Sequence, residues 1–141
     1  MDIKNFKIKN LGIYLQSIRK QEKPYRFMLG SFLQITGLSR LISFRINDSK
    51  FPFSKSTLAL NFFMYKKAYL EEFKRFVDLV KEGDTVVDIG ANVGFLAIPA
   101  AQKCNTGNMI AVEAHPRTFS LLKENIEKNK LSNIKYFNLA V

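Results

Sequence analysis

The stretch from Val86 to Phe95 constrains the fold of this chain more than any other part of its sequence. It reads VVDIGANVGF, a short apolar run around one acid, followed by two glycines with three residues between them. The apolar run is typical of a strand buried on both faces, as in a parallel sheet. The glycines predict a sharp turn from this strand into a helix whose free N–H groups point into the turn. The sequence therefore predicts the first strand, turn and helix of a nucleotide-binding α/β fold.

The spacing of the glycines separates two classes of ligand. A dinucleotide site requires G-x-G-x-x-G and a P-loop requires a Lys-Ser/Thr pair, and the sequence has neither pattern here. Asp88, near the end of the strand, would repel a phosphate group but could accept a hydrogen bond from an ammonium or hydroxyl group. The combination favours a nucleoside with a cationic amino-acid tail, and so indicates S-adenosylmethionine as the cofactor.

A second acid follows at the position where such folds bind ribose. The apolar run from Met109 to Val112 ends in Glu113, and an acid at the tip of the second strand accepts hydrogen bonds from ribose hydroxyl groups. We predict a cofactor site that consists of Asp88, Gly90, Asn92, Gly94 and Glu113.

Each of these residues also has a purely structural interpretation. The glycines could serve only the tight turn, Asn92 could cap the following helix, and Asp88 could accept hydrogen bonds from N–H groups of the turn. Glu113 could be a solvated acid at the end of a strand. For Asp88 the two interpretations are equally favoured, whereas for Glu113 and the glycines we favour ligand binding.

The sequence also resembles a known family. VVDIGANVGF, together with VEAHPRTFSLLKENIEKNKLSNIKYFNLAV, is similar to the FkbM family of S-adenosylmethionine-dependent methyltransferases, over about residues 83–141. The resemblance implies a class I Rossmann-like fold and O-methylation of a hydroxyl group on a glycan, a lipid-linked molecule or a natural product. It also implies that Gly90, Asn92 and Gly94 hold the methionine end of the cofactor and that Glu113 binds its ribose. It names no catalytic base within this chain.

Periodicity places the remaining elements. We expect helical segments near residues 11–18 and 27–35, interrupted by Pro24, then a β-hairpin with strands at 41–46 and from 51 onward. A helix at 67–82, a helix at 95–103, a strand at 109–113, a helix from 116 and a strand at 134–141 should follow. The expected architecture is an α/β, Rossmann-like class I methyltransferase fold truncated after its third strand. Residues 1–67 would form a basic helical and hairpin lead-in, and residues 68–141 the N-terminal half of the cofactor domain.

The net charge of +10 is concentrated in one half of the chain. Residues 1–67 hold thirteen Lys and Arg against three Asp and Glu, whereas the two signs balance in residues 68–141. A basic segment can bind nucleic acid or an acidic lipid surface, but a solvated basic face on a cytoplasmic protein is the interpretation we favour. A peripheral contact with an anionic membrane ranks next, and nucleic acid ranks last. The expected acceptor is a small molecule or a glycan.

Composition excludes several other site classes. A single cysteine, Cys104, cannot form an internal disulfide, and a single histidine, His115, cannot build a metal cluster. No signal peptide or membrane-spanning run is visible. The alternatives to a small-molecule methyltransferase are an RNA methyltransferase, which the basic lead-in allows, and a non-catalytic protein that only binds the cofactor. The oligomeric state stays open.

Overall fold

The computed structural model describes residues 22–140, and its centre is a parallel sheet of three strands. The strands are β3 (Thr85–Ile89), β4 (Asn108–Val112) and β5 (Ile134–Phe137), in the order β3-β4-β5. Asp88 is paired with Ala111 in the register of β3 and β4. The strand predicted in the apolar run before Gly90 and the strands predicted at 109–113 and 134–141 are confirmed, although β5 ends earlier than expected. The helix expected near residues 11–18 lies outside the described residues.

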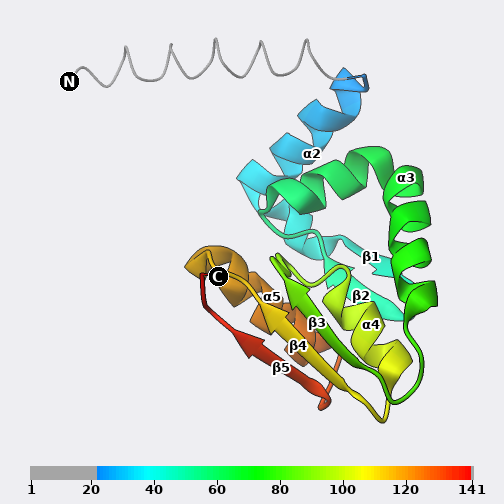
Figure 1. Cartoon of the computed structure of the whole chain (residues 1–141). Helices are drawn as coiled ribbons and strands as arrows, with labels where there is room; N and C mark the ends of the chain where they lie inside the picture. The colour runs from blue at the N-terminus through cyan, green and yellow to red at the C-terminus, as the bar shows by residue number, and fades with distance from the viewer. Residues whose placement is uncertain (1–21, 141) are drawn as a thin grey trace.

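Two helices connect the strands and cover one face of the sheet (Figure 1). They are α4 (Ala97–Cys104), between β3 and β4, and α5 (Pro116–Lys128), between β4 and β5. Pro99 is the third residue of α4, where its missing N–H is tolerated because the first turn lacks intrahelical acceptors. Pro116 begins α5, a position that favours proline. Both crossovers therefore follow the predicted βαβ pattern.

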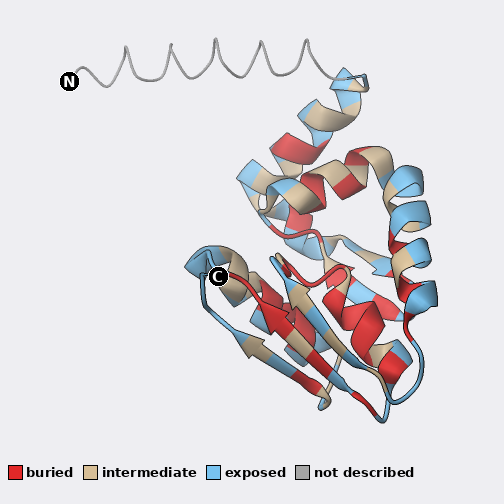
Figure 2. Ribbon diagram, in the orientation of Figure 1, coloured by how far each residue is buried: buried red, intermediate tan, exposed pale blue. Residues whose placement is uncertain are grey.

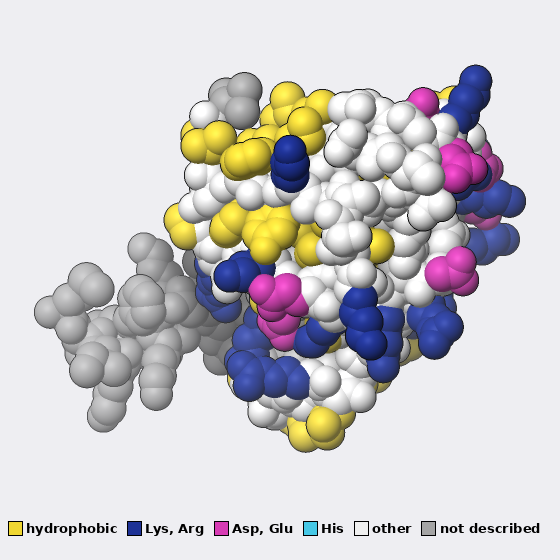
Figure 3. All heavy atoms as spheres, turned by 90° about the horizontal axis from the view of Figure 1, so that it is seen from below, with side chains coloured by type: hydrophobic (Ala, Val, Ile, Leu, Met, Phe, Trp, Pro, Cys, Tyr) yellow, Lys and Arg dark blue, Asp and Glu magenta, His cyan; other side chains and the backbone are white. Residues whose placement is uncertain are grey.

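The opposite face of the sheet is open among the described residues. Val87 is 55% exposed, Ile89 is 65% exposed and Phe137 is 43% exposed, and Figure 2 shows β5 largely exposed beside a largely buried β4. In the view from below, hydrophobic side chains gather at the upper left (Figure 3). The prediction that the first strand is buried on both faces is therefore wrong for residues 22–140, because helices cover only one face.

The hairpin is present and is fixed to the helices behind the sheet. Strands β1 (Ser43–Ile46) and β2 (Ser49–Pro52) pair in antiparallel register. The side-chain Oδ1 of Asn129, just after α5, accepts the N–H of Lys50 at 2.8 Å, and its Nδ2 donates to the Lys50 carbonyl at 2.9 Å. These two bonds hold the hairpin against the C-terminal end of α5.

Two further helices lie above the hairpin. Helix α2 (Pro24–Thr36) begins at the proline that was expected to interrupt a helix, and it is followed by a short 3₁₀ helix, η1 (Leu38–Leu41). Helix α3 (Thr57–Leu79) begins ten residues before its predicted start, because the Ser56 side chain caps it by accepting the N–H of Ala59 at 3.0 Å. It crosses position 67, and the predicted division of the chain there stays a prediction.

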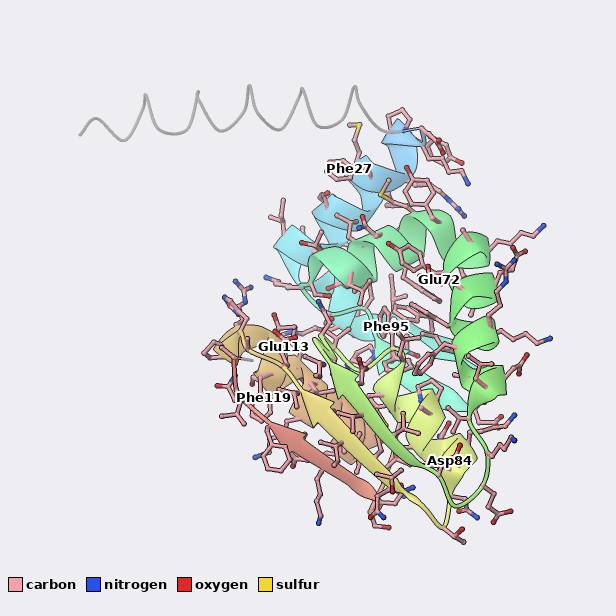
Figure 4. The ribbon with its side chains drawn as sticks, viewed as in Figure 1. Phe27, Glu72, Asp84, Phe95, Glu113 and Phe119 are labelled. Atoms are coloured by element: carbon pink, nitrogen blue, oxygen red, sulfur yellow. The ribbon has the colours of Figure 1, made fainter. Side chains whose placement is uncertain are left out.

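Aromatic side chains join the hairpin, α3 and the segment before α4. Phe95 lies at the centre of this cluster, with its ring centroid 4.8 Å from that of Phe51, 5.4 Å from that of Phe62 and 6.0 Å from that of Phe73 (Figure 4). Edge-to-face pairs of this kind contribute about 0.5–1.5 kcal/mol beyond their buried area. Phe95 is thus a core residue that fixes the glycine-rich turn to the rest of the molecule.

None of the helices within residues 22–140 is both long enough and apolar enough to cross a bilayer.

Candidate cofactor site

The glycine-rich turn lies at the carboxyl ends of β3 and β4, where open α/β sheets bind their ligands. Gly90, Asn92 and Gly94 all have positive φ, at 82°, 51° and 90°. The N–H groups of Gly90 and Ala91 both donate to the carbonyl of Val112, at 2.8 and 2.9 Å. The turn is therefore bonded directly to the last residue of the neighbouring strand, which brings Gly90 and Asn92 close to Glu113. Asp88, one strand away, lies close enough to Glu113 for the two charges to interact.

Glu113 has a structural role that its sequence position does not reveal. Its side chain lies beyond the carboxyl end of β4 (Figure 4) and is only 8% exposed. One carboxylate oxygen accepts the N–H of Asn92 at 2.9 Å, and the other accepts the N–H of His115 at 2.9 Å. Glu113 thus connects the glycine-rich turn to the loop after β4. Because a carboxylate has about four acceptor positions, this role leaves room for ribose hydroxyl groups.

Asp88 is the free charge at this site. Its side chain is half-buried, and among residues 22–140 its carboxylate has no hydrogen-bond partner. Burial raises the pKa of Asp88 above its ordinary value, and the nearby Glu113 carboxylate raises it further. The structural interpretation, in which Asp88 accepts N–H groups of the turn, is not what the structure shows. A half-buried carboxylate without a partner attracts a cationic ligand.

The two glycines have different roles. A Cβ atom added to Gly90 would have no neighbour within 4 Å, so only its positive φ disfavours other residues. A Cβ atom at Gly94 would lie 2.8 Å from Cδ1 of Ile98 and 2.9 Å from Cδ1 of Leu122. A side chain at Gly94 would therefore need both a positive φ and a shift of the buried ends of Ile98 and Leu122, whereas Gly90 leaves open space beside the backbone in which a ligand can lie.

Asn92 does not cap α4, whose N-cap position is occupied by Leu96 without a side-chain bond. Instead, its Oδ1 is buried and has no hydrogen-bond partner within the described residues. A buried acceptor without a partner costs about 1–3 kcal/mol, and a donor on a bound ligand would satisfy it. This orphaned oxygen, the free Asp88 carboxylate and the open space at Gly90 all fit a ligand that carries a cation and donor groups, as S-adenosylmethionine does.

Two asparagines that the sequence analysis did not consider support the site. Asn125 on α5 is 1% exposed and donates to the carbonyl of Val93 at 2.8 Å. Asn138 donates to the carbonyls of Glu113 and Ala114 at 2.8 and 2.9 Å. An asparagine on the apolar side of a predicted helix is a signal that could have revealed Asn125, because buried amides require partners. Within residues 22–140, no group of His, Cys, Asp and Glu is arranged to hold a metal ion.

Comparison with known proteins identifies a family to which the chain is similar. The sequence model of the TRM5/TYW2 methyltransferase domain matches residues 54–138. A tRNA(Phe) (4-demethylwyosine(37)-C(7)) aminocarboxypropyltransferase of Methanocaldococcus jannaschii is 35% identical over 71 residues, which cover 50% of this chain and 28% of that protein. A tRNA (guanine(37)-N(1))-methyltransferase of Drosophila pseudoobscura pseudoobscura is 41% identical over 69 residues, which cover 48% of this chain and 15% of that protein.

A solved structure agrees with these matches. The crystal structure of M. jannaschii TYW2 in complex with AdoMet is 30% identical with a TM-score of 0.50, covering 63% of this chain and 37% of that one. The chain thus spans well under half the length of each of these proteins. The match confirms the expected class I methyltransferase fold, and the AdoMet complex agrees with the cofactor that the sequence predicted.

Two expectations are wrong. The resemblance to the FkbM family rested on residues 83–141, where the glycine-rich turn and the acid after the second strand were predicted to bind the cofactor. The matched family model extends back to residue 54 and so includes α3, where that resemblance was weak.

The prediction of a small-molecule or glycan acceptor, with nucleic acid ranked last, is overturned by relatives whose names specify tRNA. The residues predicted to bind the cofactor carry no information about the acceptor. The chain belongs to the TRM5/TYW2 methyltransferase domain family.

Proposed function

We propose that this chain supplies the S-adenosylmethionine site of an enzyme that modifies a base of tRNA by methyl transfer. The observation that carries the proposal is the family match over residues 54–138, whose relatives are named for reactions at position 37 of tRNA. The alternative of a non-catalytic protein has no such support. The basic charge of the chain is consistent with an RNA substrate.

The site residues would divide the work of holding the cofactor. Glu113 would accept hydrogen bonds from the ribose hydroxyl groups while keeping its bonds to the N–H groups of Asn92 and His115. Asp88 would face positive charge on the methionine end, and Gly90 would let the ligand lie against the backbone. When bound, the cofactor supplies an electrophilic carbon on a sulfonium sulfur. The protein contributes the position and orientation of the reacting groups. In well-oriented reactions this positioning lowers the activation barrier by at most about 7–11 kcal/mol.

A second reaction deserves a test because one relative is named as an aminocarboxypropyltransferase. In that reaction the nucleophile attacks a different carbon attached to the same sulfur, and the site residues described above would serve equally well. The two reactions are therefore distinguished by the product rather than by the residues of this chain.

The test uses unmodified tRNA transcripts and S-adenosylmethionine labelled either in the methyl group or in the aminocarboxypropyl group. We expect methyl label in the digested RNA, and a transcript with a changed base at position 37 should lose it. Aminocarboxypropyl label in the RNA would overturn the choice of methyl transfer. If the folded chain binds the cofactor but places neither label on RNA, the proposal of an RNA-modifying activity for this chain is wrong.

A further inference from the structure

One face of α5 presents a charged stripe to a surface cavity. Arg117, Leu121, Glu124 and Lys128 are separated by four, three and four residues, a spacing that places them on the same side of a helix. All four line a cavity of about 530 Å³. With a rise of 1.5 Å per residue, the stripe extends about 16 Å along the helix. The cavity is therefore an elongated feature with one wall formed by α5.

The opposite wall comes from η1 and from the segment between β2 and α3. Arg40 of η1 and Lys55 of that segment are exposed and line the same cavity. The segment is fixed in place, because Nε2 of Gln34 donates to the carbonyls of Ser54 at 2.8 Å and Ser56 at 3.1 Å. Lys55 is thus carried by backbone that is held on both sides of it.

Two smaller cavities extend this feature at both ends. One of about 380 Å³ shares Arg40 and Lys128 with the first cavity and adds Lys50. The other, of about 200 Å³, shares Lys55 and Arg117 and reaches Asn92 in the glycine-rich turn. We call the whole feature the basic groove, and its cations are Arg40, Lys50, Lys55, Arg117 and Lys128. The groove runs from the hairpin to the edge of the cofactor site.

The groove carries a strong excess of positive charge. Glu124 is the one acid that lines it, and its carboxylate is paired with Nζ of Lys128 at 2.6 Å. Among residues 22–140 the only other ion pair joins Lys123 and Glu127, so Arg40, Lys55 and Arg117 have no acidic partner. Lys and Arg side chains also predominate over the lower part of the face in Figure 3. Unpaired cations along one track suit a ligand with repeated negative charges.

We infer that the basic groove binds the phosphate backbone of the RNA substrate and so directs the RNA toward the cofactor site. This inference rests on the function proposed above. A length of about 16 Å is enough for several phosphates, since a nucleic-acid strand carries roughly one charge per 3.4 Å of duplex axis. The only aromatic side chain that lines the groove, Phe53, is fully buried and cannot stack on a base. The groove therefore positions RNA without reading its sequence.

The test compares two triple variants of the complete 141-residue chain that lose the same charge. The groove variant is Arg40→Gln, Lys55→Gln and Arg117→Gln. The control variant is Arg75→Gln, Lys81→Gln and Lys103→Gln, whose side chains are exposed and lie outside the groove. Binding to a fluorescein-labelled, unmodified tRNA anticodon arm is measured by anisotropy at several salt concentrations. Circular dichroism verifies folding, and calorimetry verifies S-adenosylmethionine binding.

The groove variant should bind the RNA roughly tenfold or more weakly than the control. The slope of the logarithm of its binding constant against the logarithm of the salt concentration should become shallower by about two, because each lost phosphate contact to single-stranded RNA contributes about 0.7 to that slope. Its affinity for S-adenosylmethionine should not change. Equal losses in the two variants, or competition by polyglutamate as effective as by unlabelled RNA, would overturn the groove while leaving the proposed function intact. A chain that binds RNA normally through the groove but does not bind the cofactor would instead contradict the proposed function.

Discussion

Removal of the Glu113 carboxylate should lower the free energy of unfolding even when no ligand is bound. In Glu113→Ala, the N–H groups of Asn92 and His115 each lose a charged acceptor at 2.9 Å. A hydrogen bond to a charged group contributes about 1.5–3 kcal/mol, so the two together predict a loss of about 3–6 kcal/mol. The side chain is only 8% exposed, so water cannot easily replace it. This loss is a large fraction of the stability of about 5–15 kcal/mol that is typical of a domain.

Urea unfolding followed by circular dichroism measures this loss. Glu113→Gln retains one acceptor oxygen and should lose about half as much stability. The matched control is Glu127→Ala on the exposed side of α5, which should change stability by less than about 0.5 kcal/mol. A Glu113→Ala variant that unfolds within about 1 kcal/mol of the wild type would refute the structural role. Binding studies that use only Glu113→Ala would therefore confuse a lost fold with a lost ligand contact.

Four further predictions follow from the same structure. Both glycines have positive φ, so an alanine at Gly90 should cost about 1–2 kcal/mol. Gly94→Ala should cost more, about 2–4 kcal/mol, because its Cβ would also displace the buried ends of Ile98 and Leu122; thermal melts compare the two. The pKa of Asp88 is raised in the folded chain, so the folded chain binds this proton more tightly than the unfolded chain does. The resulting contribution to the free energy of unfolding is present below the ordinary pKa of an aspartate and is lost as pH rises through the raised pKa. Wild type should thus lose stability relative to Asp88→Asn as the pH rises, and parallel curves would contradict this. Cys104 is fully buried and burial raises its pKa, so a thiol reagent should label it slowly until urea is added. Asn129→Ala should lose about 1–2 kcal/mol in urea unfolding as the hairpin detaches, and an unchanged midpoint would argue against that attachment.

Local patterns were sufficient to predict much of the fold. Apolar runs marked β3 and β4, and the proline at 116 together with the apolar spacing marked α5. The start of α3 was missed because the bulky apolar run at 62–65 lacks the apolar and polar alternation of an amphipathic helix, although Ser56 gave a capping signal. The kink at Tyr65, where φ is −123°, has no proline or glycine to mark it in the sequence.

The cofactor-binding roles assigned to the site residues stay a prediction, and several of these residues have structural roles that the sequence did not indicate. Gly94 looked like a ligand contact, and only the approach of Leu122, far away in sequence, shows that packing also favours a glycine there. The double bond of Glu113 to backbone N–H groups depends on turn conformations that a sequence does not display. Charge counting placed all the excess in residues 1–67, yet the basic groove takes Arg117 and Lys128 from the balanced half. Spatial clusters of this kind appear only once the chain is folded.

The most direct test of a cofactor site at the glycine-rich turn is calorimetric titration of S-adenosylmethionine into the folded chain and into Asp88→Asn. The wild type should bind, and the variant should bind roughly 10–150-fold more weakly, because a charged contact contributes about 1.5–3 kcal/mol. Glu127→Gln, an exposed substitution of the same kind, should bind like the wild type. A wild-type chain that is folded but shows no binding, or an Asp88→Asn variant with unchanged affinity, would contradict the site.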